Sequence, residues 1–449
     1  MVRRHSRLGL IIRLGVVLVA GAFSLTQATA SNAAFQKLLT FTGVSNGGQA
    51  WSAPIIDASG NLFGVTSEGG DGLCTNGSFT TGCGTVYELS PPVAGTQWTE
   101  TLLYQFRDDG DGTYPVGSLV FDKAGNLYGT TDNGGLGGGT VFELSPPASG
   151  SGPWTKTTLY NFPGETQGSH PEAGLVFDKL GNLYGTAIYG GNCNITPGCG
   201  GVVFELSPPV ADETVWSYAV IYTFQGMPDG AVPQSTLVFD GSGRLYGTTQ
   251  EGGSSTGPEN GGGTVFQLTP PSSSGGVWKE RVLYAFGTQA GDGYAPRSGV
   301  VFGKSEILYG DTQFGFTGSG TVYQLAPPAS PGDPWTESVL YAFDGSDGNG
   351  PFGSVALGSD GSIYGTTIYG GSMEKGNVFQ LTPPSAPGNP WVETSLTSFG
   401  QSAYPLAGLT LGKGGWLYGA TMGGIVAETC ETGSQGQQLG CGQVFRFKP

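Results

Sequence analysis

Carboxylates and aromatic rings recur at one place in this sequence, in the two residues that precede a Gly-Gly pair or its equivalent. Seven such pairs occur: Ser67-Glu68, Asp132-Asn133, Ile188-Tyr189, Gln250-Glu251, Gln313-Phe314, Ile368-Tyr369 and Met422-Gly423. Aromatic rings offer flat apolar area and carboxylates accept hydrogen bonds from hydroxyl groups, so these side chains could bind a carbohydrate or a peptide. The ligand-binding candidates are Glu68, Asp132, Tyr189, Glu251, Phe314 and Tyr369. Ordinary variability of surface loops is the alternative interpretation.

Three of these carboxylates, Glu68, Asp132 and Glu251, are also weak candidates for catalysis, because two carboxyl groups suffice for glycoside cleavage. The distance between two of these carboxyl groups would decide whether they could cleave a glycoside, and the sequence does not give that distance. The leading hypothesis is therefore a non-catalytic binding scaffold for a glycan or an extracellular protein. A glycoside hydrolase that uses paired carboxylates is the main alternative, and a structural envelope protein without a ligand is the third.

A second acidic stretch, RDDGDG at residues 107–112, contains Asp108, Asp109 and Asp111. Calcium favours oxygen ligands of this kind, which makes these three weak calcium candidates. Because no complete twelve-residue calcium loop is present, solvated turns remain the simpler interpretation. We expect no metal and no cofactor.

The first 30 residues are typical of a secretory signal. Arg3, Arg4 and Arg7 precede an apolar stretch, and Ala28-Thr29-Ala30 forms a small-residue cleavage pattern. The alternative, a membrane anchor, is disfavoured because the apolar run is shorter than the roughly 20 residues that span a bilayer. Its removal takes away four of the 18 basic residues and none of the 34 acidic ones, leaving a formal charge of −20. Such a chain is a poor partner for nucleic acid or anionic membranes, and we expect a secreted monomer, extracellular or periplasmic, without membrane insertion.

Histidine is nearly absent from the expected mature chain, because His5 lies in the signal and only His170 remains. Zinc sites of the usual His-rich kinds are therefore excluded, and a Ser-His-Asp or Cys-His arrangement would have to use His170. That histidine precedes a proline at a place where the other copies of a repeat carry different residues. We interpret it as a variable loop position.

The six cysteines fall into three close pairs: Cys74 with Cys83, Cys193 with Cys199, and Cys430 with Cys441. Each pair lies within one expected loop between two strands that pair with each other, so the loop ends are near one another. An even number of cysteines in an exported chain favours disulfides, and a metal site is disfavoured because the Cys-x-x-Cys spacing is missing. We predict three local disulfides.

Glycine and proline make up about a quarter of the chain, with 83 and 29 residues, but regularly spaced aromatic residues argue against disorder. A Leu-aromatic-Gly element recurs seven times, at Leu62, Leu127, Leu183, Leu245, Leu308, Ile363 and Leu417. An element such as TVFEL follows each copy, and one such as GLVFD precedes it. A fourth element, such as TTLYNF, follows a tryptophan in six copies. These apolar runs between Gly, Pro and Asp residues predict four strands in each repeat.

The seventh copy of the fourth strand stands at the front of the chain, as KLLTF from Lys37 to Phe41. The chain stops just after a third strand, Gln443 to Phe447. We predict that these two strands pair, which removes free sheet edges. Four-stranded antiparallel repeats closed end to end describe an all-β fold, a seven-bladed β-propeller that forms a single domain over residues 31–449. An open β-solenoid is the alternative, and the split repeat disfavours it.

In such blades the loops between the second and third strands and those between the fourth and first strands share one end. This end is variable and carries the binding candidates. The opposite end is uniform, with Asp-x-x-Gly-Asn type turns and a tryptophan after each Pro-Pro segment, and we interpret both features as structural. The six tryptophans that we expect to pack between blades, rather than to bind sugars, are Trp98, Trp154, Trp216, Trp278, Trp335 and Trp391.

The repeated signature LYGTT..GG...GTVF.L.P, followed by W.....LY.F, resembles the bacterial tandem-repeat family of choice-of-anchor GloVer-containing proteins. The match extends over essentially all of the expected mature chain. The resemblance implies a secreted or surface repeat protein of unassigned activity, in some members with a C-terminal sorting anchor. This chain ends in CGQVFRFKP without a hydrophobic tail, so we expect release rather than anchoring.

Overall fold

The computed structural model describes residues 35–449 except 44, 77–78, 151, 192–199, 211–212, 255–257, 259, 274, 290, 316–317, 331, 387, 401–402 and 425–440, and gives only the backbone of 75, 76, 79 and 80. The predicted secretory signal, residues 1–30, lies outside the described residues. Residues Ala33–Pro449 form one compact unit.

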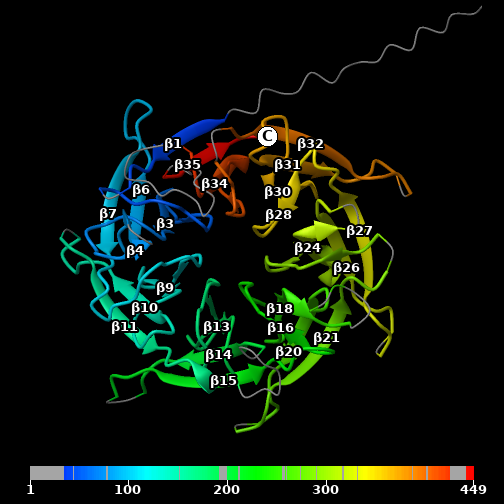
Figure 1. Cartoon of the computed structure of the whole chain (residues 1–449), viewed down its shortest axis with the longest axis horizontal. Helices are drawn as coiled ribbons and strands as arrows, with labels where there is room; N and C mark the ends of the chain where they lie inside the picture. The colour runs from blue at the N-terminus through cyan, green and yellow to red at the C-terminus, as the bar shows by residue number, and fades with distance from the viewer. Residues whose placement is uncertain are drawn as a thin grey trace, which may run out of the picture. The chain divides into compact units, whose positions relative to one another are not determined.

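Seven four-stranded antiparallel sheets follow one another around a ring, so the predicted seven-bladed β-propeller is confirmed (Figure 1). Blades 1 to 3 are β2 (Ile55–Ile56), β3 (Leu62–Thr66), β6 (Thr85–Ser90) and β7 (Thr99–Gln105); β8 (Val120–Phe121), β9 (Leu127–Thr131), β10 (Thr140–Ser145) and β11 (Thr155–Asn161); and β12 (Val176–Phe177), β13 (Leu183–Ala187), β14 (Val202–Ser207) and β15 (Ser217–Thr223). Blades 4 to 6 are β17 (Val238–Phe239), β18 (Leu245–Thr249), β20 (Thr264–Thr269) and β21 (Lys279–Ala285); β23 (Val301–Phe302), β24 (Leu308–Thr312), β26 (Thr321–Ala326) and β27 (Thr336–Ala342); and β29 (Ala356–Leu357), β30 (Ile363–Tyr369), β31 (Asn377–Thr382) and β32 (Val392–Ser398).

Blade 7 combines the two ends of the described chain. It consists of β33 (Thr410–Leu411), β34 (Leu417–Thr421), β35 (Gln443–Phe447) and, from the front of the sequence, β1 (Gln36–Thr40). β1 runs antiparallel to β35, with Gln36 opposite Arg446 and Thr40 opposite Gln443. Figure 1 shows β1, in blue, beside β35, in red. The predicted closure is confirmed, and it leaves neither strand with an open edge on that side.

The recurring glycine of each second strand is explained by the recurring aromatic residue of the third. In blade 2 a Cβ atom on Gly129 would lie 2.7 Å from Cζ of Phe142, whose ring crosses the glycine. Phe142 is fully buried, as is Phe204 at the same place in blade 3. Burying a phenylalanine side chain contributes about 1.5–3 kcal/mol. The Leu-Tyr-Gly element and the Val-Phe element are therefore two halves of one packing unit.

The tryptophans of the uniform end pack between neighbouring blades, as predicted. Trp154 of blade 2 lies 6.4 Å from Phe63 of blade 1, and Trp216 of blade 3 lies 6.1 Å from Tyr128 of blade 2, measured between ring centroids. Trp98 of blade 1 contacts Tyr418 of blade 7 in the same way, across the closure. The aspartate turns are also structural: Oδ1 of Asp57 accepts hydrogen bonds from the backbone of Ser59 and Asn61, both at 2.8 Å.

The described regular structure is almost entirely β. Three short 3-10 turns, at Glu165–Gln167, Lys304–Glu306 and Lys413–Gly415, are its helical segments. Within this part of the chain, no helix has the length and apolar character to cross a membrane.

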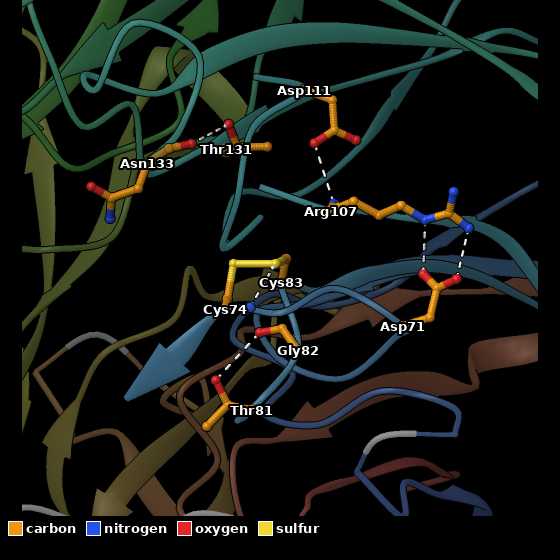
Figure 2. Close-up of a disulfide and its surroundings, with 9 residues drawn as sticks. All are labelled: Asp71, Cys74, Thr81, Gly82, Cys83, Arg107, Asp111, Thr131 and Asn133. Carbon is orange, nitrogen blue, oxygen red and sulfur yellow. Dashed lines mark hydrogen bonds and ion pairs between the residues drawn. A yellow bond between two sulfur atoms is a disulfide. The ribbon is translucent and has the colours of Figure 1, made fainter. Parts of the chain in front are cut away.

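One predicted disulfide is confirmed in the loop between the second and third strands of blade 1. Cys74 and Cys83 are bonded, and both are buried (Figure 2). In the same loop Asp71 accepts two hydrogen bonds from the guanidinium of Arg107, at 3.0 and 2.7 Å, which ties this loop to the one that follows the fourth strand. The other two predicted pairs include Cys193, Cys199 and Cys430, which lie outside the described residues.

Candidate functional site: the central channel and its rim

Each blade joins its neighbour through one residue in a left-handed backbone conformation. These residues precede the first strands of blades 1 to 7 and have φ angles between 46° and 66°: Gln49, Tyr114, His170, Val232, Ala295, Gly350 and Tyr404. In blade 3 the N–H of His170 donates to Gly138 O of the preceding blade at 2.8 Å, and its carbonyl accepts from Ile188 N at 3.2 Å. A left-handed backbone costs about 1–2 kcal/mol for a residue with a Cβ atom, and two hydrogen bonds of about 1 kcal/mol each offset that cost.

This junction brings the loops before the first strands to the end of the second strands. The two run antiparallel at Gly48 with Glu68, Ser169 with Tyr189, and β16 (Gly230–Ala231) with β19 (Glu251–Gly252). β22 (Gly293–Tyr294) with β25 (Phe314–Gly315), and β28 (Asn349–Pro351) with β30, repeat the arrangement. Glu68, Tyr189, Glu251, Phe314 and Tyr369 therefore occupy one equivalent position, in blades 1, 3, 4, 5 and 6. We call the end of the second strands and the loops paired with it the rim.

A cavity of about 760 Å³ begins at the rim and is lined by residues of all seven blades. Val301 of β23 and Thr410 of β33 are among them, so the cavity continues along the first strands. Its volume is within the range of roughly 300–1,000 Å³ that is typical of small-molecule sites. We call it the central channel.

Seven lining residues stand at one equivalent position, one from each blade. Each stands two residues after the left-handed residue of its blade, and we call them the channel ring: Trp51, Val116, Glu172, Gln234, Arg297, Phe352 and Leu406. The polar members come from the three successive blades 3, 4 and 5, and the apolar members from the other four. Phe352 and Leu406 pack together with Ile368, Tyr404 and Met422, which fixes the apolar side of the ring.

The polar side of the channel ring is held by hydrogen bonds and charge. Nε2 of Gln234 donates to Oε2 of Glu172 at 2.8 Å. The guanidinium of Arg297 lies 5.2 Å from the ring centroid of Phe352, a cation–π contact. Nε of Arg297 and Oε1 of Gln234 are buried atoms without a hydrogen-bond partner among the described residues. Polar atoms of this kind are costly when unpaired, by about 1–3 kcal/mol each.

The pKa of Glu172 reflects chiefly its burial in the channel wall. Burial raises the pKa of Glu172 above its usual value, and the negative charge of Asp132 raises it further, although the hydrogen bond from Gln234 and the charge of Arg297 act in the opposite direction. Burial also lowers the pKa of Arg297, despite the acidic groups Glu172 and Glu251 nearby.

His170 connects Asp132 to the rim. Its Nδ1 lies 2.9 Å from Oδ1 of Asp132, and this contact raises the pKa of the imidazole. The ring of His170 makes an edge-to-face contact with Tyr189, with centroids 5.5 Å apart. His170 was predicted to be a variable loop position; the structure shows that it also pairs with a residue of the channel wall.

Of the predicted ligand-binding residues, Glu68 and Asp132 line the channel, and Glu68 is buried. The other four stand at the rim. Tyr189 and Tyr369 are 44% and 49% exposed, the ring of Phe314 stacks on Tyr294 with centroids 5.2 Å apart, and Glu251 accepts a hydrogen bond from Asn260 at 3.4 Å. Whether any of the six contacts a ligand stays a prediction.

The sequence interpretation missed the channel ring. A usable signal was present: in six copies the ring residue directly follows a recurring proline, and its type changes from copy to copy. Comparison of that position across the copies would have found Glu172, Gln234 and Arg297 on successive repeats. Trp51 escapes this rule because Ala50 stands where the other copies have proline.

Of the weak calcium candidates Asp108, Asp109 and Asp111, the last is engaged in protein contacts. Oδ2 of Asp111 accepts a hydrogen bond from Tyr104 at 2.7 Å, and its main-chain carbonyl accepts one from Lys156. Among the described residues, no group of three or more His, Cys, Asp or Glu side chains is arranged to hold a metal ion.

Comparisons with known proteins agree with the repeat and the fold. A family model described as the Gloeobacter/Verrucomicrobia repeat matches residues 20–258 and 254–449. Curated proteins gave no match. Among solved structures, the extracellular domain of a one-component system from B. thetaiotaomicron aligns with a TM-score of 0.51 and 11% identity, over 93% of this chain and 41% of that one. This chain thus spans about two fifths of that longer chain. A luciferin-regenerating enzyme aligns with a TM-score of 0.41 and 10% identity, over 93% of this chain and 95% of its own length.

Proposed function

This chain belongs to the Gloeobacter/Verrucomicrobia repeat family, and we propose that it is a binding protein that takes part of a glycan into the central channel from the rim. The observation that carries the proposal is the divided channel ring. Glu172, Gln234 and Arg297 present hydrogen-bonding groups on one side, and apolar side chains including Trp51 and Phe352 occupy the other. A sugar has apolar ring faces and hydroxyl edges, so it matches such a wall.

The setting of the protein is part of the proposal. The Cys74–Cys83 disulfide supports an oxidising compartment outside the cytoplasm. The relative from B. thetaiotaomicron is an extracellular domain, which agrees with that location. The exposed rim tyrosines, Tyr189 and Tyr369, would contact the part of the glycan that remains outside the channel.

A channel-blocking variant tests the proposal. Val116→Trp adds an indole to the channel ring, and we expect it to abolish binding on a polysaccharide array probed with the protein from residue 31 onward. Leu180→Trp is the matched control, because Leu180 is exposed in the turn between the first and second strands, at the opposite end of blade 3. Undiminished binding by a folded Val116→Trp variant would show that the glycan does not enter the channel. If the unmodified protein binds no polysaccharide on a broad array, a protein partner would be favoured instead.

Glycoside hydrolysis is the second candidate function, because one specific observation favours it. The pKa of Glu172 is raised, first by burial and then by the charge of Asp132, and a raised carboxyl pKa is a property of the general acid of a glycosidase. The same array, read again after long incubation, tests this candidate. Loss of immobilised glycan with the unmodified protein, but not with Glu172→Gln, would establish catalysis. Retained glycan would support binding without hydrolysis.

A further inference from the structure

Arg297 differs from the other arginines of the described chain in what its guanidinium contacts. Each of the others donates to an acceptor in the protein: Arg107 to Asp71, Arg244 to Asp240, Arg281 to the carbonyl of Asp333, and Arg446 to Gln36. Within the same part of the chain, Arg297 has no hydrogen-bond acceptor and forms no ion pair. Its guanidinium packs over the ring of Phe352 instead, with Cζ 5.2 Å from the ring centroid.

The unpaired donors of Arg297 include groups that a molecule in the channel can reach. Arg297 lines the central channel, and Nε is the nitrogen of its guanidinium that is both buried and unpaired. Nη1 and Nη2 also have no acceptor among the described residues, but they are not fully buried. These two groups carry four of the five N–H donors of an arginine. Arg297 therefore presents free donors to the channel that it lines.

A guanidinium in this state suits a planar oxyanion. Two of its N–H groups can donate parallel hydrogen bonds to the two oxygens of one carboxylate, and such charge-assisted bonds are roughly twice as strong as neutral ones. Arginine keeps its charge when it is partly buried and is more weakly hydrated than lysine, so it loses less when it leaves water to bind an anion. The aromatic ring of Phe352 supports the guanidinium without occupying its donors.

Two acids act on Arg297 without taking these donors. The charges of Glu172 and Glu251 favour the charged form of its guanidinium. Glu172 is instead hydrogen-bonded by Gln234 at 2.8 Å, and Glu251 by Asn260 at 3.4 Å. Because burial raises the pKa of Glu172, the negative charge of this residue decreases at mildly acidic pH. An anion that approaches Arg297 then meets less repulsion.

We propose that the saccharide bound in the central channel carries a uronic acid, whose carboxylate binds the Nη groups of Arg297 while the apolar side of the channel ring contacts a face of the sugar. The formal charge of the whole protein, −16, repels long polyanions. A glycan with a single acidic group is therefore favoured over a polyuronate. This inference rests on the proposed function and adds the chemistry of the ligand.

Ligand-observed NMR titrations with four monosaccharides test the inference: methyl glucuronide, its methyl ester, methyl glucoside and methyl glucoside 6-sulfate, at mildly acidic pH and low salt. We expect the glucuronide to bind at least about tenfold more tightly than its uncharged ester, a difference of about 1.4 kcal/mol. Arg297→Gln should remove most of that preference while the neutral glucoside still binds. Arg281→Gln makes the same change of charge at an exposed arginine of β21, and this matched control should keep the preference.

The other outcomes separate the two proposals. Equal affinity for the glucuronide and its ester would overturn the uronic acid assignment and leave glycan binding in place. A preference that persists in Arg297→Gln would overturn it because the carboxylate then binds elsewhere, and a stronger preference for the 6-sulfate would overturn it in favour of a sulfated sugar. If none of the four binds, the assignment fails, and the polysaccharide array decides separately whether the proposed function fails with it.

Discussion

The ammonium group of Lys156 donates a hydrogen bond to the main-chain carbonyl of Asp111, from the fourth strand of blade 2 to the loop that precedes that blade. It also donates to Oγ1 of Thr158 at 2.7 Å. Three other blades carry glutamate at the position of Lys156 and a negative aspartate beside it: Glu280 with Asp229, Glu337 with Asp292, and Glu393 with Asp347. Burial, followed by the charge of the aspartate, raises the pKa of each of these glutamates to about 7. The repeat therefore contains one version of this contact with a cation and three versions with two acids.

Replacement of one of these glutamates by lysine, the residue that blade 2 has at this position, should stabilise the protein at alkaline pH. A carboxyl whose pKa is raised on folding stabilises the native state below its unfolded value near 4.5, and that contribution is lost as pH rises to about 7. We expect Glu337→Lys to raise the stability at pH 8 by about 1–2 kcal/mol, after allowance for solvent screening, and much less at pH 5. Thermal melts at both pH values measure this. Glu213→Gln serves as an exposed control, and an equal effect of Glu337→Lys at both pH values would contradict the explanation.

Asp311 is a second buried acid, and other blades show which residue could replace it. Four blades have threonine at this place, and in blade 4 Oγ1 of Thr248 donates to the carbonyl of Ser298 in the next blade at 2.8 Å. Asp311 is fully buried, with one oxygen accepting from Ser298 at 2.9 Å and Oδ2 unpaired, and burial raises its pKa to about 7.

We expect Asp311→Thr to stabilise the protein at pH 8, by at most about 4 kcal/mol, because ionisation of the buried carboxyl above pH 7 is then avoided. The sign is that of any raised carboxyl: the native protein loses stability as pH rises from about 4 to about 7. Urea unfolding across this range gives the measurement. Asp311→Asn tests the same cause, since it should flatten the pH dependence even if packing costs some stability.

The disulfide of blade 1 should contribute measurably to stability. It closes a loop with a sequence separation of 9, and loop-closure entropy then predicts about 2–3 kcal/mol. We expect the Cys74→Ala, Cys83→Ala double variant to lose this amount in urea unfolding. If the double variant is as stable as the oxidised protein, loss of the cross-link does not increase the conformational freedom of the unfolded chain.

The closure between β1 and β35 should be essential to the whole ring. Phe41 follows β1, is 1% exposed and contacts Tyr87 of blade 1, so Phe41→Ala should cost about 3–5 kcal/mol. Gln36→Ala, at the exposed start of the same strand, should change stability by less than about 0.5 kcal/mol. A small effect of Phe41→Ala would mean that the ring tolerates an open seventh blade.

The contact between His170 and Asp132 should be visible in a proton titration. Because Asp132 raises the pKa of His170, Asp132→Asn should lower it toward its ordinary value, as read from the imidazole signal in NMR. The linked stability is present below pH 6.5, the usual histidine value, and is lost as pH rises through the folded pKa. An unchanged titration would remove the contact from the account of the channel.

The sequence by itself determined the blade, the number of blades and the closure, because each of these depends on strand signals that recur at fixed spacing. Leu127 and Phe142 belong to elements repeated seven times, and the strand from Lys37 to Phe41 was recognisable as the missing fourth strand. The disulfide of Cys74 with Cys83 followed from loop ends that pairing strands must bring together. Patterns of this kind can be recognised from the order of the residues alone.

The candidate site was decided by tertiary structure. Glu172 and Arg297 are 125 residues apart in the chain and become parts of one wall only when the ring closes. Likewise, the repeat position predicted similar surroundings for Glu68, Glu251 and Tyr369, yet only Glu68 among them lines the channel. Closure of the ring places equivalent positions around one axis, while the side chain at each position decides how far it reaches inward. A repeat pattern therefore predicts where residues stand, and the packing of all seven blades decides which of them meet.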